Sequence, residues 1–463
     1  MTIGSRARPD TLLRSQRVVL PGGVQPASVH ITDGVITAIG AIDAAVPSVR
    51  TTVEDLGDLV VMPGLVDAHV HINEPGRTEW EGFASATQSA AAGGITTLVD
   101  MPLNCIPATT TREALAIKRA ATVGKLWVDV GFWGGVVPGN QEELAGLIAE
   151  GVLGFKCFMV PSGVDEFGFV GAAELEAAAP VLAAAGVPLL AHAEAPEVIT
   201  PSSRALAELS AEARRDHRTW SASRPHEAEI DAIATLLDVA ERYGCHVHVV
   251  HLATARATFR LEEARAEGLP VTVESCPHYL TFSEKDIPLG ATEYKCAPPI
   301  RDESNRLGLW EGLRRGVIEM IVTDHSPSPP SLKAIEQGDF IAAWGGIASL
   351  QVSLSAVWTE ASRRGFHLLD IARWMSEHPA RLAGLTDRGR IEVGRRADLC
   401  VFDPEATFVV DGALLHHRHK LTPYHGRTLR GTVVSTWLGG QCIHNRGALG
   451  VIPNGQLVRR TPL

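Results

Sequence analysis

Cysteine is scarce in this sequence, and long hydrophobic runs are missing. The 463 residues include seven cysteines, an odd and dispersed set without a Cys-x-x-Cys pair. Such usage is typical of a protein whose thiols stay reduced, which argues against a disulfide scaffold. No stretch reaches the roughly 18 apolar residues that a membrane-spanning helix needs, and residues 1–10 are polar, unlike a signal peptide. These absences predict a cytoplasmic protein without a membrane partner.

Positive charge is also in deficit. The chain has 42 lysines and arginines against 53 aspartates and glutamates, a formal net charge of −11 at pH 7. An acidic balance argues against nucleic acid and against anionic membrane surfaces as partners. With 45% hydrophobic and 21% charged residues, the composition is that of an ordinary globular protein. The charge balance does not exclude a small molecule as the partner.

A dinucleotide-binding fingerprint is missing as well. No Gly-x-Gly-x-x-Gly follows any of the early apolar runs, which weakens the alternative of an open doubly wound sheet. Helical patterns instead alternate with short apolar runs through the middle of the chain. Eight repeats of strand and helix predict an α/β fold built on a (β/α)8 barrel. The expected strands lie at residues 65–72, 95–101, 128–134, 152–159, 187–193, 246–253, 271–276 and 319–324.

Both ends of the chain differ from the middle. Short apolar or alternating runs bounded by turn residues occur before residue 62 and again after residue 389, as expected for β-strands. One small β module built from both ends is the more economical interpretation, and two unrelated β extensions are the alternative. We therefore expect residues 1–62 and 389–463 to form the β module and residues 63–388 to form the barrel.

Histidine, lysine and aspartate occupy the ends of several expected barrel strands. Active sites of such barrels lie at this end, and titratable groups in apolar strands are costly unless they are paired or bound to metal. Side chains two residues apart on a strand share a face, so His69 and His71 both point into the barrel. The other candidates, late in the fourth, fifth, sixth and eighth strands, are Lys156, His192, His251 and Asp324.

Six such groups exceed the four ligands of one tetrahedral zinc and suit two divalent metal ions. A lysine among them is unusual, because a protonated amine is a poor metal ligand. Burial near cations lowers the pKa of Lys156, and its neutral amine can then react with carbon dioxide to give a carbamate that bridges two metals. Asp324 is the expected general base and general acid.

Simpler interpretations exist for each residue alone. A single buried histidine is more often a hydrogen-bonded core residue, Lys156 alone suggests a solvated charge, and Asp324 could cap a helix. Their shared position at strand ends favours the metal site. His417, near the C-terminal β segment, is expected on the surface.

Several motifs together carry a family resemblance. The chain resembles the cyclic amidohydrolases of the amidohydrolase superfamily over essentially its whole length, and their allantoinase branch most closely. The matching runs are Asp-Ala-His-Val-His-Ile-Asn-Glu-Pro-Gly-Arg at 67–77, Asp-Met-Pro-Leu-Asn at 100–104, Gly-Phe-Lys at 154–156, Cys-Pro-His-Tyr-Leu at 276–280, Cys-Ala-Pro-Pro-Ile-Arg at 296–301 and Thr-Asp-His-Ser-Pro at 323–327.

The resemblance implies a distorted TIM-like barrel with a β-sandwich built from both termini, and usually a homotetramer. It implies that His69 and His71 bind one metal ion and that His192 and His251 bind the other. Carbamylated Lys156 would bridge the two ions, and Asp324 would bind metal and act as the base. Zn²⁺ is the expected metal, although Co²⁺, Mn²⁺, Ni²⁺ and Fe²⁺ also suit such ligands.

The resemblance also bears on the substrate. Dihydroorotases carry arginine two residues after the second histidine, dihydropyrimidinases typically carry aspartate there, and this chain carries Asn73. The resemblance therefore implies a small neutral cyclic amide or ureide, with the hydantoin amide of allantoin hydrolysed to allantoate. Hydantoinase or dihydropyrimidinase activity and a non-catalytic scaffold are the alternatives. Expected substrate contacts are Asn73, Asn104, Ser162, Ser275 and Ala297, the last standing where allantoinases usually have serine.

Overall fold

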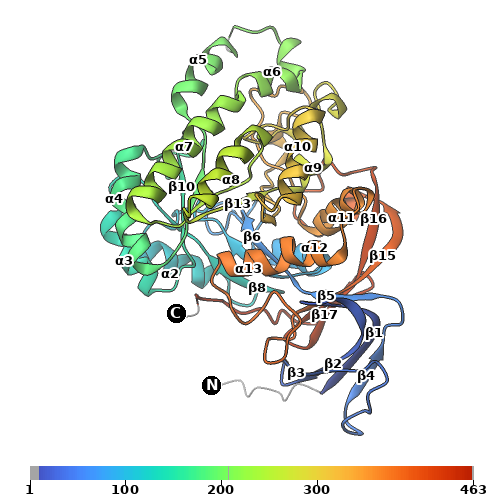
Figure 1. Cartoon of the computed structure of the whole chain (residues 1–463). Helices are drawn as coiled ribbons and strands as arrows, with labels where there is room; N and C mark the ends of the chain where they lie inside the picture. Colours follow the sequence, from blue (N-terminus) through green and yellow to red (C-terminus); the bar gives the residue numbers. More distant parts are fainter. Residues whose placement is uncertain (1–9, 207, 461–463) are drawn as a thin grey trace.

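A parallel β-barrel lies at the centre of the computed structural model, which describes residues 10–206 and 208–460 (Figure 1). Its strands pair in two groups, β6-β7-β8 and β14-β13-β12-β11-β10-β9. On one side, β9 (Gly134–Gly135) follows β8 along the chain and pairs with β10. On the other side, the N–H of His71, which follows β6, donates to the carbonyl of His325, which follows β14, at 2.8 Å. Both gaps between the groups are thereby bridged. The eight barrel strands are β6 (Leu65–Val70), β7 (Ile95–Asp100), β8 (Asp129–Phe132), β10 (Phe155–Phe158), β11 (Leu189–His192), β12 (Val247–Val249), β13 (Val271–Ser275) and β14 (Met320–Ile321).

Each of the eight apolar runs contains one of these strands, so the predicted barrel is confirmed. Every residue of β6, β7, β8 and β11 is buried. Strands of a parallel barrel are covered by helices outside and by side chains inside, which is why they appear in the sequence as continuous apolar runs.

The main helices begin and end where capping residues allow. Thr111 accepts a hydrogen bond from the N–H of Ala114 at the start of α2 (Arg112–Ala121). α4 (Ala172–Ala185) and α7 (His226–Tyr243) both end at glycines in the left-handed conformation. In the described part of the chain, no helix combines the length and apolarity needed to cross a membrane. The remaining helices are α1 (Phe83–Ala92), α3 (Gln141–Ala149), α5 (Pro196–Leu206), α6 (His217–Ala222), α8 (Thr258–Ala266), α9 (Pro277–Thr281), α10 (Glu303–Arg314), α11 (Ser353–Arg363), α12 (Leu368–Ala372) and α13 (His378–Leu382).

One nine-stranded sheet collects strands from both ends of the chain (Figure 1). Its order is β18-β17-β16-β15-β5-β1-β2-β3, with β4 beside β1. The two ends meet where β5 pairs antiparallel with β15, for example Met62 with Cys400. Strands of both termini thus share one module, while its limits at residues 62 and 389 stay predictions. The strands are β1 (Thr11–Leu20), β2 (Gly23–Thr32), β3 (Val35–Gly40), β4 (Thr52–Asp55), β5 (Val60–Pro63), β15 (Leu399–Val409), β16 (Thr428–Leu438), β17 (Gln441–Asn445) and β18 (Ala448–Leu449).

Residues 410–427, between β15 and β16, return from the β module to the barrel. The N–H of Arg418 donates to the carboxylate of Glu81 at 3.2 Å. His417 is fully buried, with its ring centroid 5.8 Å from that of His325. The prediction that His417 lies on the surface is wrong, because the local sequence does not reveal that this segment folds back onto the barrel.

Candidate active site

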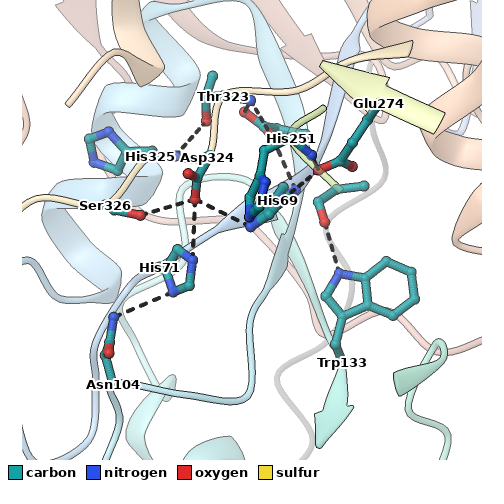
Figure 2. A network of polar contacts seen from close by, with 12 residues as sticks. His69, His71, Asn104, Trp133, His251, Glu274, Thr323, Asp324, His325 and Ser326 are labelled. Atoms are coloured by element: carbon teal, nitrogen blue, oxygen red, sulfur yellow. Dashed lines mark hydrogen bonds and ion pairs between the residues drawn. The ribbon is translucent and has the colours of Figure 1, made fainter. Parts of the chain in front are cut away.

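Four imidazole rings lie in a row at the carboxyl ends of the barrel strands. β6 carries His69 and is followed by His71, β11 ends at His192, and His251 follows β12. In the order His71, His69, His251 and His192, successive ring centroids are 5.5, 5.4 and 4.6 Å apart. The fold therefore brings together four predicted ligands from three strands, three of which are visible in Figure 2.

Asp324 lies against the His69 and His71 end of this row (Figure 2). Its Oδ1 is 3.2 Å from Nε2 of His69 and 3.3 Å from Nε2 of His71. The hydroxyl of Ser326 donates to the same oxygen at 3.1 Å. The possible ligand atoms of His69, His71 and Asp324 all lie within 4.8 Å of one another. This spacing suits a single metal ion held by two imidazoles and a carboxylate.

Lys156 lies on β10, beside the strand that ends at His192, and its side chain is fully buried. Its Nζ has no hydrogen-bond partner among the described residues and sits 4.9 Å from the ring centroid of Phe158. Burial lowers the pKa of Lys156 to about 8. A buried ammonium without an acceptor is costly, so this position favours a neutral amine that can be modified.

Burial also favours neutral histidines in the row. It lowers the pKa of His71 and His192, and it lowers the pKa of His251 well below the usual value. Burial alone would raise the pKa of Asp324, but the neighbouring His69 and His71 hold it well below its usual range. Neutral imidazoles and an ionised carboxylate are the forms that bind metal, so the donor set fits divalent ions.

A carboxylate that the sequence analysis missed supports the row. Glu274 on β13 is fully buried, and its Oε1 lies 2.5 Å from Nδ1 of His69 and accepts the N–H of His251 at 3.1 Å. Its Oε2 lies 2.9 Å from Nε2 of His248. Burial alone would raise the pKa of Glu274, but His69 and His248 bring it down to about 2. A glutamate inside a strand expected to be buried was the signal that could have revealed it.

Four residues around the site adopt left-handed backbone conformations. The φ angles are 66° for Asn73, 64° for Asn104, 39° for His251 and 46° for Asp324. Asparagine, aspartate and histidine occupy this region more often than other non-glycine residues, although each such conformation still costs on the order of 1–3 kcal/mol. Such conformations concentrate at functional sites, where the surrounding structure enforces them.

A cavity of about 240 Å³ opens onto the histidine row. Pockets for drug-sized ligands have roughly 300–1,000 Å³, so this one suits a compact substrate. Three of the predicted substrate contacts, Asn104, Ser162 and Ala297, line it. The amide nitrogen of Asn104 also lies 3.5 Å from Nδ1 of His71.

Asn73 and Ser275, the other two predicted contacts, are not among the described residues that line this cavity. The side-chain amide of Asn73 donates to the carbonyl of Pro327 at 3.3 Å. The hydroxyl of Ser275 donates to the carbonyl of Leu252 at 2.9 Å. Both side chains thus donate to backbone carbonyl groups, while Oδ1 of Asn73 has no hydrogen-bond partner among the described residues.

The outer wall of the cavity contains residues that the sequence analysis did not select. One ends β10 and one lies on α6, while the others come from connecting segments, where no strand or helix periodicity marks the inward-facing side chains. The additional lining residues with aromatic or charged side chains are Phe158, Trp220, Arg224, Lys295 and Trp344.

Comparisons with known proteins agree with this geometry. The model of the amidohydrolase family matches residues 60–443. The allantoinase of Streptomyces avermitilis is 49% identical, over 98% of this chain and 99% of that protein, and the allantoinase of Saccharomyces cerevisiae is 42% identical, over 97% and 98%. The L-hydantoinase (dihydropyrimidinase) from Arthrobacter aurescens is structurally similar with a TM-score of 0.92 and 32% identity, covering 98% of this chain and 100% of that one. The chain therefore belongs to the amidohydrolase family.

Proposed function

We propose that this protein hydrolyses the hydantoin amide of allantoin to give allantoate. The observation that carries the proposal is the convergence of His69, His71 and Asp324 at a compact cavity, in a chain 49% identical to an allantoinase over nearly its whole length. Hydrolysis of an unreactive amide needs an activated water and a proton donor for the departing nitrogen, and this donor set can provide both.

Two divalent metal ions, Zn²⁺ by preference, would fill the donor set. We assign the first ion to His69, His71 and Asp324, and the second to His192 and His251. Lys156, as a carbamate formed with carbon dioxide, would bridge them; its buried and partner-free Nζ supports this assignment. When bound, such ions supply Lewis acidity that activates water and polarises a carbonyl group.

Asp324 is the residue that we assign to proton transfer. The hydrogen bond from Ser326 fixes the orientation of its carboxylate beside the histidines. Water adds to the ring carbonyl carbon, Asp324 takes one proton from it, and the same proton passes to the ring nitrogen as the C–N bond breaks. The product carries a carboxylate and a terminal ureide NH₂. One proton is released per turnover, because the ureide is not basic.

A substrate panel tests the proposal. With purified, metal-loaded protein, we expect kcat/KM for allantoin to exceed that for hydantoin, dihydrouracil and dihydroorotate. If any of these three were hydrolysed faster, allantoin would not be the preferred substrate. Faster hydrolysis of hydantoin or dihydrouracil would favour the hydantoinase or dihydropyrimidinase alternative. If no substrate reacted and metal content stayed near zero after growth with ample zinc, the protein would be a non-catalytic scaffold.

We further propose that the protein acts as a cytoplasmic homotetramer. The resemblance to the cyclic amidohydrolases supports the tetramer, and seven free cysteines, six of them buried, support a reducing compartment. Light scattering coupled to gel filtration measures the mass directly. A monomer at micromolar concentration would contradict the tetramer.

Glu274→Gln is expected to weaken metal binding by about 10- to 100-fold. The carboxylate holds the Nδ1 side of His69 and the backbone of His251, and an amide of the same shape loses the negative charge that orients the imidazole. Competition with a chromogenic chelator measures the affinity. Glu405→Gln is the matched control, because Glu405 forms an exposed pair with Arg17 far from the site. Equal affinities in Glu274→Gln and wild type would show that Glu274 does not support the metal ligands.

A further inference from the structure

Two basic side chains, Arg224 and Lys295, line the cavity, and both contact Trp220. Cζ of Arg224 lies 4.9 Å from the ring centroid of Trp220, and Nζ of Lys295 lies 4.1 Å from it. The indole N–H of Trp220 donates to the carbonyl of Cys296 at 2.9 Å, which fixes the ring. All four residues line the cavity. Trp220 is therefore a platform that holds two cations at its wall.

Lys295 is already committed to neighbouring backbone. Its Nζ donates to the carbonyl of Ala343 at 2.5 Å and to that of Ile341 at 3.2 Å. These bonds hold the segment that supplies Trp344 to the cavity. Burial lowers the pKa of Lys295 to about 7, with Arg224 adding to the effect. Lys295 thus acts as a structural anchor for the outer wall.

Arg224 has hydrogen-bond donors that its ion pair with Glu194 does not use. Its Nη1 pairs with Glu194, whose Oε2 also lies 2.6 Å from Nε2 of His192. Within the described part of the chain, Nε and Nη2 of Arg224 have no hydrogen-bond acceptor, and the side chain is 14% exposed. Glu194 on one side and Trp220 on the other fix the planar guanidinium. Its remaining N–H groups are therefore available to a ligand close to His192.

The charge of the cavity wall selects the kind of ligand group that fits beside Arg224. Asp324 is the one carboxylate among the described lining residues, and it lies with His69 and His71. In the reaction, the ring carbonyl must reach these residues, so a substituent on the ring extends along the remaining wall. A guanidinium there favours an oxygen acceptor and disfavours an amine or an apolar arm.

We propose that Arg224 is a specificity-determining residue that donates hydrogen bonds to the carbonyl oxygen of a ureido arm on the hydantoin ring. The planar ureido group matches the planar guanidinium, and Trp220 keeps the guanidinium in place. This inference rests on the proposed function and deepens it. It explains why a cavity for a neutral substrate carries an arginine whose charge the reaction itself does not need.

The test compares substrates that differ only in the arm: allantoin, unsubstituted hydantoin and 5-(carboxymethyl)hydantoin. Arg224→Lys keeps the positive charge that faces Glu194 but loses the planar set of guanidinium N–H donors. We expect kcat/KM for allantoin to fall about 10- to 100-fold, because charged hydrogen bonds to the arm disappear, while hydantoin changes less than about threefold. Metal content is expected to equal that of wild type. Arg218→Lys, at an exposed position of α6, the helix that precedes Arg224, is the matched control and keeps wild-type selectivity.

Three results would overturn the inference. Equal losses for allantoin and hydantoin, with reduced metal content, would make Arg224 a positioning residue that acts through Glu194 and His192. Unchanged allantoin turnover in Arg224→Lys and in Arg224→Gln would show that Arg224 does not recognise the substrate. If the wild-type protein preferred the carboxymethyl arm to the ureido arm, Arg224 would instead recognise an anionic substituent. Failure of wild type to hydrolyse allantoin while it hydrolyses hydantoin would instead contradict the proposed function.

Discussion

Lys156→Ala is expected to lose activity on the order of 10⁴-fold, because residues that act as one catalytic unit fail together when one is removed. The lysine is fully buried beside the histidine row, and its Nζ has no hydrogen-bond partner among the described residues. Truncation to alanine removes the amine that would become the bridging carbamate. Steady-state kinetics with allantoin and metal analysis of the same sample measure the loss of rate and of metal.

Rescue distinguishes a carbamate from a simple structural lysine. Acetate or propionate should partly restore activity in Lys156→Ala, since a small carboxylate fits the space of the lost side chain and offers two oxygens. Lys156→Met is the matched control, because its thioether chain fills most of that space without a donor oxygen. We expect Lys156→Met to be inactive and not to be rescued. Near-wild-type activity of Lys156→Ala without additives would contradict the bridging role.

Asp324→Asn is expected to lower kcat by about 10²- to 10⁴-fold, the range of a lost general acid–base group. Asparagine keeps the shape of the side chain and its hydrogen bond from Ser326, but it cannot take a proton from water. The carboxylate lies 3.2 Å from His69 and 3.3 Å from His71, so metal affinity is expected to fall as well. Both kcat at saturating metal and metal affinity therefore have to be measured.

Ser326→Ala distinguishes the effect of orienting the Asp324 carboxylate from its role in proton transfer. This variant removes one hydrogen bond of 3.1 Å and leaves the carboxylate in place. A single hydrogen bond of this kind contributes roughly 1.5–3 kcal/mol when the acceptor is charged, so kcat is expected to fall by about 10- to 150-fold at most. If Asp324→Asn at full metal occupancy were no slower than Ser326→Ala, another residue would have to transfer the proton.

The strands and the metal-binding candidates could be predicted from the sequence for one physical reason. A barrel strand is buried on both faces, so it needs a continuous apolar run, and a titratable residue in such a run stands out. His69 and His71 share a face because side chains alternate along a strand. Helix ends such as those of α2 and α4 also depend on the nearby sequence, because caps and left-handed glycines act within a few positions of the chain.

Residues whose roles depend on distant partners were not predictable in this way. Arg224 looks like an ordinary charged residue until the fold places it beside Glu194. For Glu274, the strand position was visible in the sequence, but its contact with His69 was not. His417 is buried because residues 410–427 cross back to the barrel. Only the fold shows that the amide of Asn73 donates to the carbonyl of Pro327, and its role as a substrate contact stays a prediction.

The sequence by itself determined the barrel, its eight strands and the six candidate metal ligands, since these follow from local periodicity and from the cost of burying charge. Only the tertiary structure decided how the imidazoles line up, which carboxylate supports them and which side chains form the outer wall of the cavity. Those features depend on contacts between segments far apart in the chain. Packing of the whole molecule sets such contacts, and no local pattern encodes them.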